Sequence, residues 1–260
     1  MPPESAPIFP PHQSAPASRW RRFARAALDA VFPRSCVHCG GPVEEGGLRH
    51  VCPGCVSQHL HLVAEPHCTT CGHPFYGELV ENRGCEHCEA LVPRFDRGKT
   101  AILLKGAGRA LVHTLKYHHG LHVLEDVRAI MRATPGYADF IRGKVLVPVP
   151  LHPRKLRERG YNQSRWLAQC AAEAAGGGTV VADLLVRRID TVSQTNFDRA
   201  TRQANLKNAF ALAPGAVIQR ALPYLIIDDV FTTGSTLNAC AAVLRDAGAL
   251  NLEVVTFGHG

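Results

Sequence analysis

The segment from Leu225 to Thr236 constrains the fold and chemistry of this chain more than any other. Its run Leu-Ile-Ile-Asp-Asp predicts a buried strand that ends in two carboxylates, Asp228 and Asp229. A Thr-Thr-Gly-Ser-Thr turn follows, and the apolar spacing from Leu237 to Ala247 predicts a helix. A small-residue turn between a strand and a helix directs free backbone N–H groups, and here several hydroxyls, at one point. We therefore expect a phosphate at the turn, with sugar hydroxyls or hydrated Mg²⁺ at the carboxylates.

This segment resembles the phosphoribosyl-diphosphate (PRPP) loop of type I phosphoribosyltransferases at every position of the motif. An ordinary strand-to-helix turn would explain Gly234 and one hydroxyl, but not two consecutive acids at the end of a buried strand. The Mg²⁺ site of an NTPase would also need the run G-x-x-x-x-G-K-[ST], which the sequence lacks. The predicted ligand-binding residues here are Asp228, Asp229, Thr232, Thr233, Gly234, Ser235 and Thr236.

Eight of the ten cysteines form four C-x-x-C pairs, and this spacing predicts metal binding. Each pair presents two thiolates from one tight turn, and two pairs complete a tetrahedral zinc site. Twelve residues separate the first two pairs and thirteen the last two, which suggests two successive zinc ribbons. Crossed pairing stays open, and so does substitution by His38, His67 or His87. The predicted structural zinc ligands are Cys36, Cys39, Cys52, Cys55, Cys68, Cys71, Cys85 and Cys88.

The 260 residues suit one medium domain preceded by a small one. A net charge of +7 favours anionic partners without choosing among phosphosugars, nucleic acid and acidic lipid. No run of eighteen apolar residues occurs, and residues 1–18 lack the apolar core of a signal peptide. We expect a disordered tail over 1–18 and a cytoplasmic protein. Residues 19–32 predict a basic amphipathic helix, which either packs on its own domain or lies on the inner membrane as a peripheral contact.

Strands alternate with helices after residue 95, which predicts an α/β fold with a doubly wound parallel sheet. The expected helices cover 106–118, 122–133 and 161–175. The expected strands lie at 144–150, 179–181, 184–186, 224–227 and 253–257. The sequence thus divides into a tail (1–18), a helix (19–32), a double zinc ribbon (33–94) and a sheet domain (95–260). Ligands in such sheets bind beyond the carboxyl ends of the strands, where the Asp-Asp turn also lies.

A basic loop follows the strand that ends at Pro150. Residues 151–165 hold five Lys or Arg against one Glu, a composition suited to gripping a diphosphate. A solvated basic turn is the alternative. The predicted anion-binding residues of this loop are Arg154, Lys155, Arg159 and Gly160. The polar stretch 193–210 looks like a flap that could bring Arg199 or Arg202 over a bound anion, or else an ordinary surface loop.

Taken in order, four motifs resemble the ComF family over roughly residues 30 to 260. They are the cysteine pairs, the run Val-Pro-Val-Pro-Leu-His-Pro-x-Lys-Leu-Arg-x-Arg-Gly-Tyr-Asn-Gln, the Arg-x-x-Arg-x-x-Asn-Leu stretch and the PRPP loop. Members of this family pair a zinc ribbon with a phosphoribosyltransferase-like domain. They are linked to natural transformation, in which a ComF protein works at the cytoplasmic side of the inner membrane with a helicase-like ATPase on single-stranded DNA.

The resemblance implies that the two aspartates bind the ribose hydroxyls, residues 232–236 the 5′-phosphate, and the loop 152–160 the Mg²⁺-diphosphate. The candidates for a catalytic role are Asp228, Asp229, Arg199 and Arg202. The chain stops three residues past Phe257, so no C-terminal hood for an acceptor base is expected. Two functions stay open: a PRPP-binding adaptor in DNA uptake, and an active phosphoribosyltransferase with an unknown acceptor. The oligomeric state is not predicted.

Overall fold

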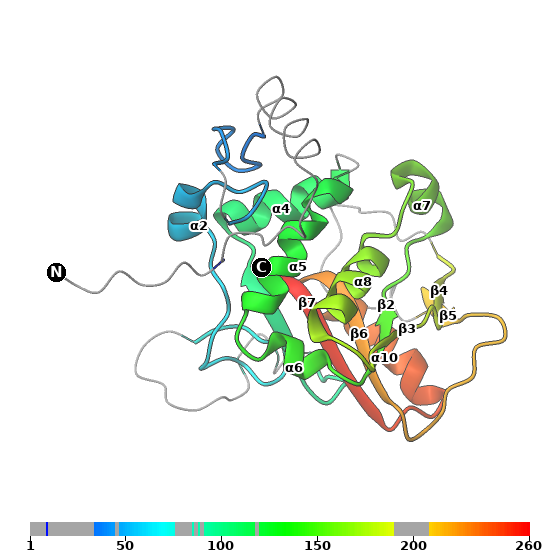
Figure 1. The fold of residues 1–260 in the computed structure, drawn as a ribbon. Helices are drawn as coiled ribbons and strands as arrows, with labels where there is room; N and C mark the ends of the chain where they lie inside the picture. The colour runs from blue at the N-terminus through cyan, green and yellow to red at the C-terminus, as the bar shows by residue number, and fades with distance from the viewer. Residues whose placement is uncertain are drawn as a thin grey trace.

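The computed structural model describes Phe9, residues 34–44 and 47–75, Cys85, Cys88, and residues 91–117, 120–189 and 208–260 (Figure 1). Apart from Phe9, the predicted tail over 1–18 and the predicted helix over 19–32 lie outside these described residues. Most of the polar stretch 193–210 lies outside them too, including Arg199 and Arg202.

A five-stranded parallel sheet forms the centre of the molecule, with the strand order β1-β7-β6-β2-β3. The strands are β1 (Gly98–Leu103), β2 (Val145–Pro148), β3 (Val180–Val181), β6 (Pro223–Phe231) and β7 (Asn251–His259). In β6 the run Tyr224–Ile227 is buried on both sides, as expected for a parallel sheet covered on two faces. The predicted parallel α/β sheet is confirmed.

Helices cover both faces of this sheet (Figure 1). On one face, α4 (Gly106–Tyr117), α5 (Leu124–Ala133, after the 3₁₀ turn η1 at Leu121–Val123), α6 (Tyr137–Ile141) and α8 (Gln163–Ala175) pack on Leu225 and Ile227 of β6. On the other face, α10 (Ser235–Asp246) packs on Tyr224 and Ile226. The alternation of side chains along β6 therefore serves two separate apolar cores.

Strand β1 is absent from the sequence-based prediction, because Lys99 and Thr100 make its start look polar. Both side chains are buried and have specific partners. Lys99 Nζ lies 3.2 Å from His67 Nε2, and Thr100 Oγ1 donates to the Cys71 carbonyl at 2.9 Å. These partners come from the cysteine-rich segment, so only the tertiary structure makes this strand stable.

Two further segments differ from the prediction. The basic loop contains a short helix, α7 (Pro153–Arg159), which begins after His152 and ends at Gly160 with φ +83°. The strand material predicted near 184–186 forms β4 (Leu185–Arg187), which pairs antiparallel with β5 (Phe210–Leu212) instead of joining the main sheet. This two-stranded sheet packs on the face of the main sheet that α10 covers, through Leu185 and Phe210.

The cysteine-rich segment continues across the edge of the sheet. It contains one described helix, α2 (Pro53–His59), which lies beside α4 (Figure 1). The chain then pairs antiparallel with β1: Val63 N donates to the Ala101 carbonyl at 2.8 Å, and Leu103 N to the His61 carbonyl at 2.9 Å. This pairing covers an edge strand that would otherwise expose unpaired backbone groups.

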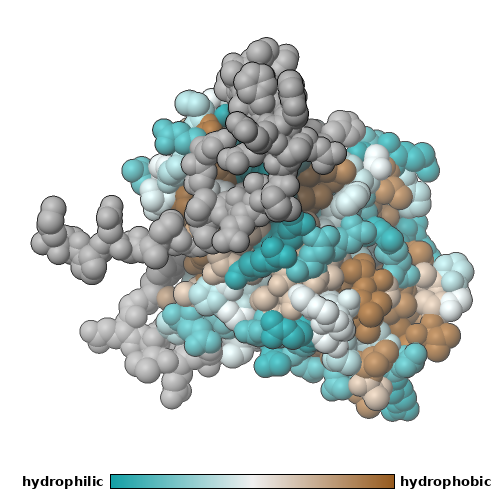
Figure 2. All heavy atoms as spheres, in the orientation of Figure 1, coloured by the Kyte–Doolittle hydropathy of each residue, from teal (hydrophilic) through white to brown (hydrophobic). Residues whose placement is uncertain are grey.

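Within the described residues, no helix is both long and apolar enough to cross a membrane. Hydrophilic and hydrophobic residues are interspersed over the described part of the face shown in Figure 2. The basic amphipathic helix predicted at 19–32 lies outside this description, so its contact with a membrane remains a prediction.

Candidate functional site

The carboxyl ends of β2 and β6 bring the two predicted binding segments to the same edge of the sheet. Pro148 pairs with Ile227 in parallel register, and Val149 N donates to the Ile227 carbonyl at 3.0 Å. The basic helix α7 follows β2, while the acidic pair, Asp228 and Asp229, lies within β6, which extends four residues beyond the predicted strand end at Ile227. Segments about 70 residues apart in sequence therefore meet as the parallel topology predicts.

The two carboxylates of the acidic pair have different surroundings. Asp228 Oδ1 accepts hydrogen bonds from Ser164 Oγ at 2.8 Å and from Asp229 N at 2.9 Å. Asp229 is 5% exposed, and its Oδ1 lies 3.0 Å from Lys116 Nζ. Its second oxygen, Oδ2, is buried with no hydrogen-bond partner among the described residues. A buried carboxylate oxygen without a donor is costly, and a cation or hydroxyl group would satisfy it.

Burial and, after it, the neighbouring charge of Asp229 raise the pKa of Asp228 to about 7. The hydroxyl of Ser164, the backbone N–H of Asp229 and the ammonium of Lys116 oppose this rise. Asp228 therefore gains or loses its proton near neutral pH. A bound cation or a ligand that donates hydrogen bonds would stabilise the ionised form.

Residues 232–236, here called the phosphate turn, connect β6 to the twelve-residue helix α10. Gly234 has φ +71°, and Thr233 Oγ1 lies 2.9 Å from Ser235 Oγ. The side chains of Thr232 and Thr233 are exposed, and the N-terminal N–H groups of α10 begin at this turn. This combination of left-handed glycine, hydroxyls and a helix N-terminus suits an anion.

A cleft of about 160 Å³ lies next to the acidic pair and is here called the basic cleft. Its lining residues come from α4 and α7: Lys116, Tyr117, Lys155, Glu158 and Arg159. The Arg159 guanidinium lies 5.7 Å from the centre of the Tyr117 ring and also bonds the Gln163 side chain. Lys116 connects this cleft to the acidic pair through Asp229. Three cations around one cleft favour a ligand with several negative charges.

The structure separates the predicted basic residues of α7. Lys155 and Arg159 line the basic cleft, whereas Arg154 is exposed and pairs with Glu158 at 2.9 Å. Gly160 ends the helix. Sequence reasoning missed Lys116 and Tyr117, which end α4 and carry no motif. Their position next to the site follows from how α4 packs on the sheet, and sequence spacing does not report that packing.

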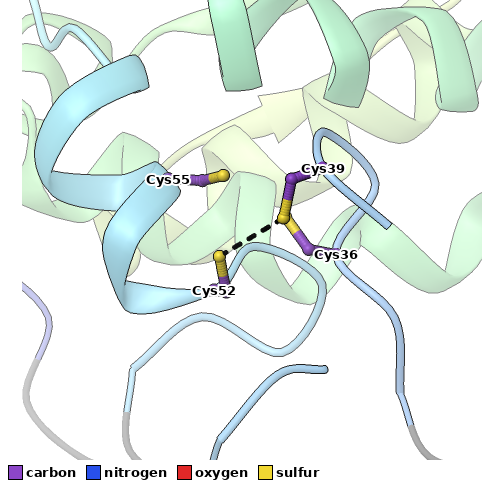
Figure 3. Close-up of side chains that lie close together, drawn as sticks. All are labelled: Cys36, Cys39, Cys52 and Cys55. Atoms are coloured by element: carbon purple, nitrogen blue, oxygen red, sulfur yellow. Dashed lines mark hydrogen bonds between the residues drawn. The ribbon is translucent and has the colours of Figure 1, made fainter. Parts of the chain in front are cut away.

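The eight paired cysteines form two clusters in which the pairs combine in sequence order. The first cluster contains Cys36, Cys39, Cys52 and Cys55 (Figure 3), and the second contains Cys68, Cys71, Cys85 and Cys88. Within each cluster all sulfur atoms lie within 4.8 Å of one another. The distance is 3.7 Å for Cys39–Cys52 and for Cys71–Cys85, and 3.9 Å for Cys68–Cys88. Tetrahedral zinc with bonds of about 2.3 Å requires sulfurs about 3.8 Å apart. Both clusters fit structural zinc, and the crossed pairing left open by the sequence does not occur.

The neighbouring histidines have other contacts. His67 bonds Lys99 and lies next to the Cys68 carbonyl, and the ring of His38 lies 4.9 Å from that of His59. His87 lies outside the described residues. Four sulfur ligands are thus available at each site without either of the described histidines.

Comparison with known proteins identifies relatives of this chain. A family model described as a double zinc ribbon domain matches residues 27–90. Competence protein F of Haemophilus influenzae is 27% identical over 235 residues, which cover 86% of this chain and 96% of that protein. The chain is similar to the ComF family over most of its length. A second relative in this family, the DNA utilization protein YhgH of Salmonella typhimurium, is 29% identical over 86% of this chain and 96% of its own length.

Two less extensive similarities accompany these. Competence protein ComFC of Streptococcus pneumoniae is 30% identical over 107 residues, or 41% of this chain and 44% of that protein. A solved hypoxanthine phosphoribosyltransferase from Staphylococcus aureus aligns with 51% of this chain and 62% of its own, at 19% identity and a TM-score of 0.30. The similarity to the ComF family rests on the nearly full-length relatives and on the double ribbon.

Proposed function

We propose that this chain binds PRPP with Mg²⁺ at the carboxyl edge of its sheet and acts as a cytoplasmic adaptor in DNA uptake. The observation that carries the binding proposal is the meeting of three features at one edge. They are the acidic pair, the phosphate turn and the basic cleft, with Lys116 contacting both the acidic pair and the cleft. Each feature matches one part of a phosphorylated ribose that also carries a diphosphate.

In the proposed complex the phosphate turn binds the 5′-phosphate through backbone N–H groups and the hydroxyls of residues 232–236. Asp228 and Asp229 accept hydrogen bonds from the ribose 2′- and 3′-hydroxyls. Lys155 and Arg159 neutralise the diphosphate from the basic cleft. Mg²⁺ would bind between the diphosphate and carboxylate oxygens, and the buried, unpartnered Oδ2 of Asp229 supports such a contact.

The proposed role in DNA uptake rests on the family. Its relatives are named competence and DNA utilization proteins, and this chain spans almost their whole length. A net charge of +7 and the exposed cations of α7 support an electrostatic contact with single-stranded DNA. A helicase-like ATPase as partner, and a peripheral contact of residues 19–32 with the inner membrane, belong to the same proposal.

An active phosphoribosyltransferase is the second candidate, and the basic cleft is the observation that favours it. In that reaction an acceptor would bond to ribose C1 while the bond from C1 to the diphosphate breaks. Lys155, Arg159 and Lys116 would stabilise the departing diphosphate. Release of diphosphate that depends on an added base or amine would establish this activity.

The binding proposal is tested by calorimetric titration with PRPP and Mg²⁺, using two arginines on the same helix. Arg159→Ala removes a cation that lines the basic cleft and should weaken binding about tenfold or more. Arg154→Ala removes an exposed cation outside the cleft and should change affinity less than about twofold. Equal effects of the two substitutions would refute the assignment of the cleft.

The DNA proposal is tested by measuring single-stranded DNA binding over a salt series, with and without Mg²⁺-PRPP. Affinity should fall steeply as salt rises, because bound phosphates release counterions from the DNA. PRPP should compete if both ligands use α7. Absence of DNA binding at low salt, together with acceptor-dependent diphosphate release, would favour the transferase instead.

A further inference from the structure

The two cysteine clusters lie on opposite faces of the sheet and have different neighbours. The first cluster belongs to the core that contains α4, α5 and α8. The chain between its two cysteine pairs is held to α5 by the carboxylate of Asp126, which accepts from Arg49 N and His50 N at 2.7 Å each. The second cluster packs with α10 and with Phe231, the last residue of β6 before the phosphate turn. Only the second cluster therefore shares a core with the turn.

The first connection between the second cluster and the turn is His259, at the end of β7. Its Nε2 lies 3.3 Å from Cys71 Sγ, and its ring stacks on Phe231 with centroids 5.3 Å apart and planes 14° from parallel. With zinc bound, Cys71 would be a thiolate that can only accept, so His259 Nε2 would carry the proton and donate to it. His259 Nδ1 lies 3.4 Å from His73 Nδ1. Cys71, His259 and Phe231 form one continuous contact.

The second connection is the segment that leaves Cys88. Leu91 N donates to the Cys88 carbonyl at 3.0 Å. A Cβ on Gly234 would lie 2.7 Å from Leu91 Cδ2 and 2.6 Å from Phe231 Cζ, so both side chains press directly on the turn. Asn238 lies near the start of α10. Its Nδ2 donates to the Leu91 carbonyl at 3.4 Å, and its Oδ1 accepts from Arg94 N at 2.6 Å. The turn is packed between this segment and the end of β6.

We propose that the metal of the second cluster positions the phosphate turn, so that ligand binding requires this zinc and not the zinc of the first cluster. Zinc fixes the sulfurs of Cys71 and Cys88 at one point. The contacts through His259 and Leu91 then hold Phe231 and Gly234 in the conformation that directs the backbone N–H groups of the phosphate turn toward the bound phosphate. His259 is a positioning residue in this arrangement. The inference uses the proposed function only for the identity of the ligand.

Matched serine substitutions test the proposal in the full chain. Cys85→Ser removes a ligand of the second cluster without altering either contact residue, and Cys52→Ser removes a ligand of the first. Zinc content, amide hydrogen exchange of the peptide covering residues 231–238 and Mg²⁺-PRPP affinity are measured for both variants. We expect each variant to lose one zinc. Only Cys85→Ser should speed exchange at the turn and weaken PRPP binding, by about tenfold or more.

Unchanged exchange at the turn in Cys85→Ser after zinc loss would overturn the proposal, and so would equal acceleration in Cys52→Ser. If wild-type protein does not bind PRPP, the proposed function fails, but the exchange comparison still decides the positioning inference.

Two substitutions of His259 keep all eight cysteines and remain informative if Cys85→Ser does not fold. His259→Phe retains the ring against Phe231 but loses the donor to Cys71, and His259→Gln retains a donor but loses the ring. Both should keep two zinc ions per chain, and both should exchange faster at the turn than wild type. Wild-type exchange rates in both variants would contradict the connection through His259.

Discussion

Replacing Asp228 by Asn should stabilise the folded protein at neutral and higher pH while removing its ligand affinity. Asp228 lies in the carboxyl-terminal half of β6, where burial and the charge of Asp229 raise its pKa from 3.8 to about 7. Between these two values the unfolded chain releases a proton that the folded protein retains. Stability therefore falls as pH rises through this window, and the loss is complete above the folded pKa. An amide of the same shape has no such dependence.

The size of the effect follows from the shift. Each pKa unit corresponds to about 1.4 kcal/mol, so a rise from 3.8 to about 7 gives an upper limit of about 4 kcal/mol. Asp228 is only partly shielded from water, which weakens the effect, so we expect about 2 kcal/mol at pH 8. For a chain of this size this corresponds to a rise in Tm of about 4–8 °C. At pH 4, close to the unfolded pKa of 3.8, little of this loss has accumulated, so the variant and wild type should unfold within about 0.5 kcal/mol of each other.

The assay is urea unfolding at pH 4 and pH 8 with zinc present throughout. Asp139→Asn is the control, because Asp139 is 73% exposed and should show no comparable gain at pH 8. The same Asp228→Asn protein should lose Mg²⁺-PRPP binding, an exchange of stability for function that is common at binding sites. A variant that is no more stable than wild type at pH 8, or equally more stable at both pH values, would refute the argument from buried charge.

Three further predictions concern the zinc content, the phosphate turn and the contact of Asp126 with the backbone of Arg49 and His50. Protein purified without chelator should contain about two zinc ions per chain, and metal analysis that finds none would contradict the cluster geometry. Gly234→Ala should cost about 2–4 kcal/mol of stability in chemical unfolding and abolish PRPP binding, since the residue has φ +71° and a Cβ would lie 2.6 Å from Phe231. Asp126→Ala should cost about 2–4 kcal/mol, because it leaves the Arg49 and His50 N–H groups without their acceptor. The neighbouring Glu125→Ala removes a partly exposed ion pair with Arg49 and should cost less than about 1 kcal/mol in the same experiment.

Local sequence determined the parts of this protein whose chemistry is contained in one short segment. The run around Asp228 predicted a buried strand, an acidic pair and a phosphate turn, and the structure has β6, a left-handed Gly234 and α10 in that order. Four C-x-x-C pairs predicted two metal sites, and two clusters with tetrahedral spacing occur. The ComF family could also be recognised from the order of these motifs. Such motifs are predictable because each is contained within about twenty consecutive residues.

The tertiary structure decided everything that depends on contacts between distant segments. It set the pairing of the cysteines and the strand nature of Lys99 and Thr100, whose buried polar groups find partners more than 25 residues away. It brought Lys116 to Asp229, although no motif marks Lys116 as a site residue. It also assigned one cysteine cluster to each face of the sheet, because the chain pairs with the edge of β1 between them. Sequence spacing carries no record of which face a segment covers, and that choice is what connects the second cluster to the phosphate turn.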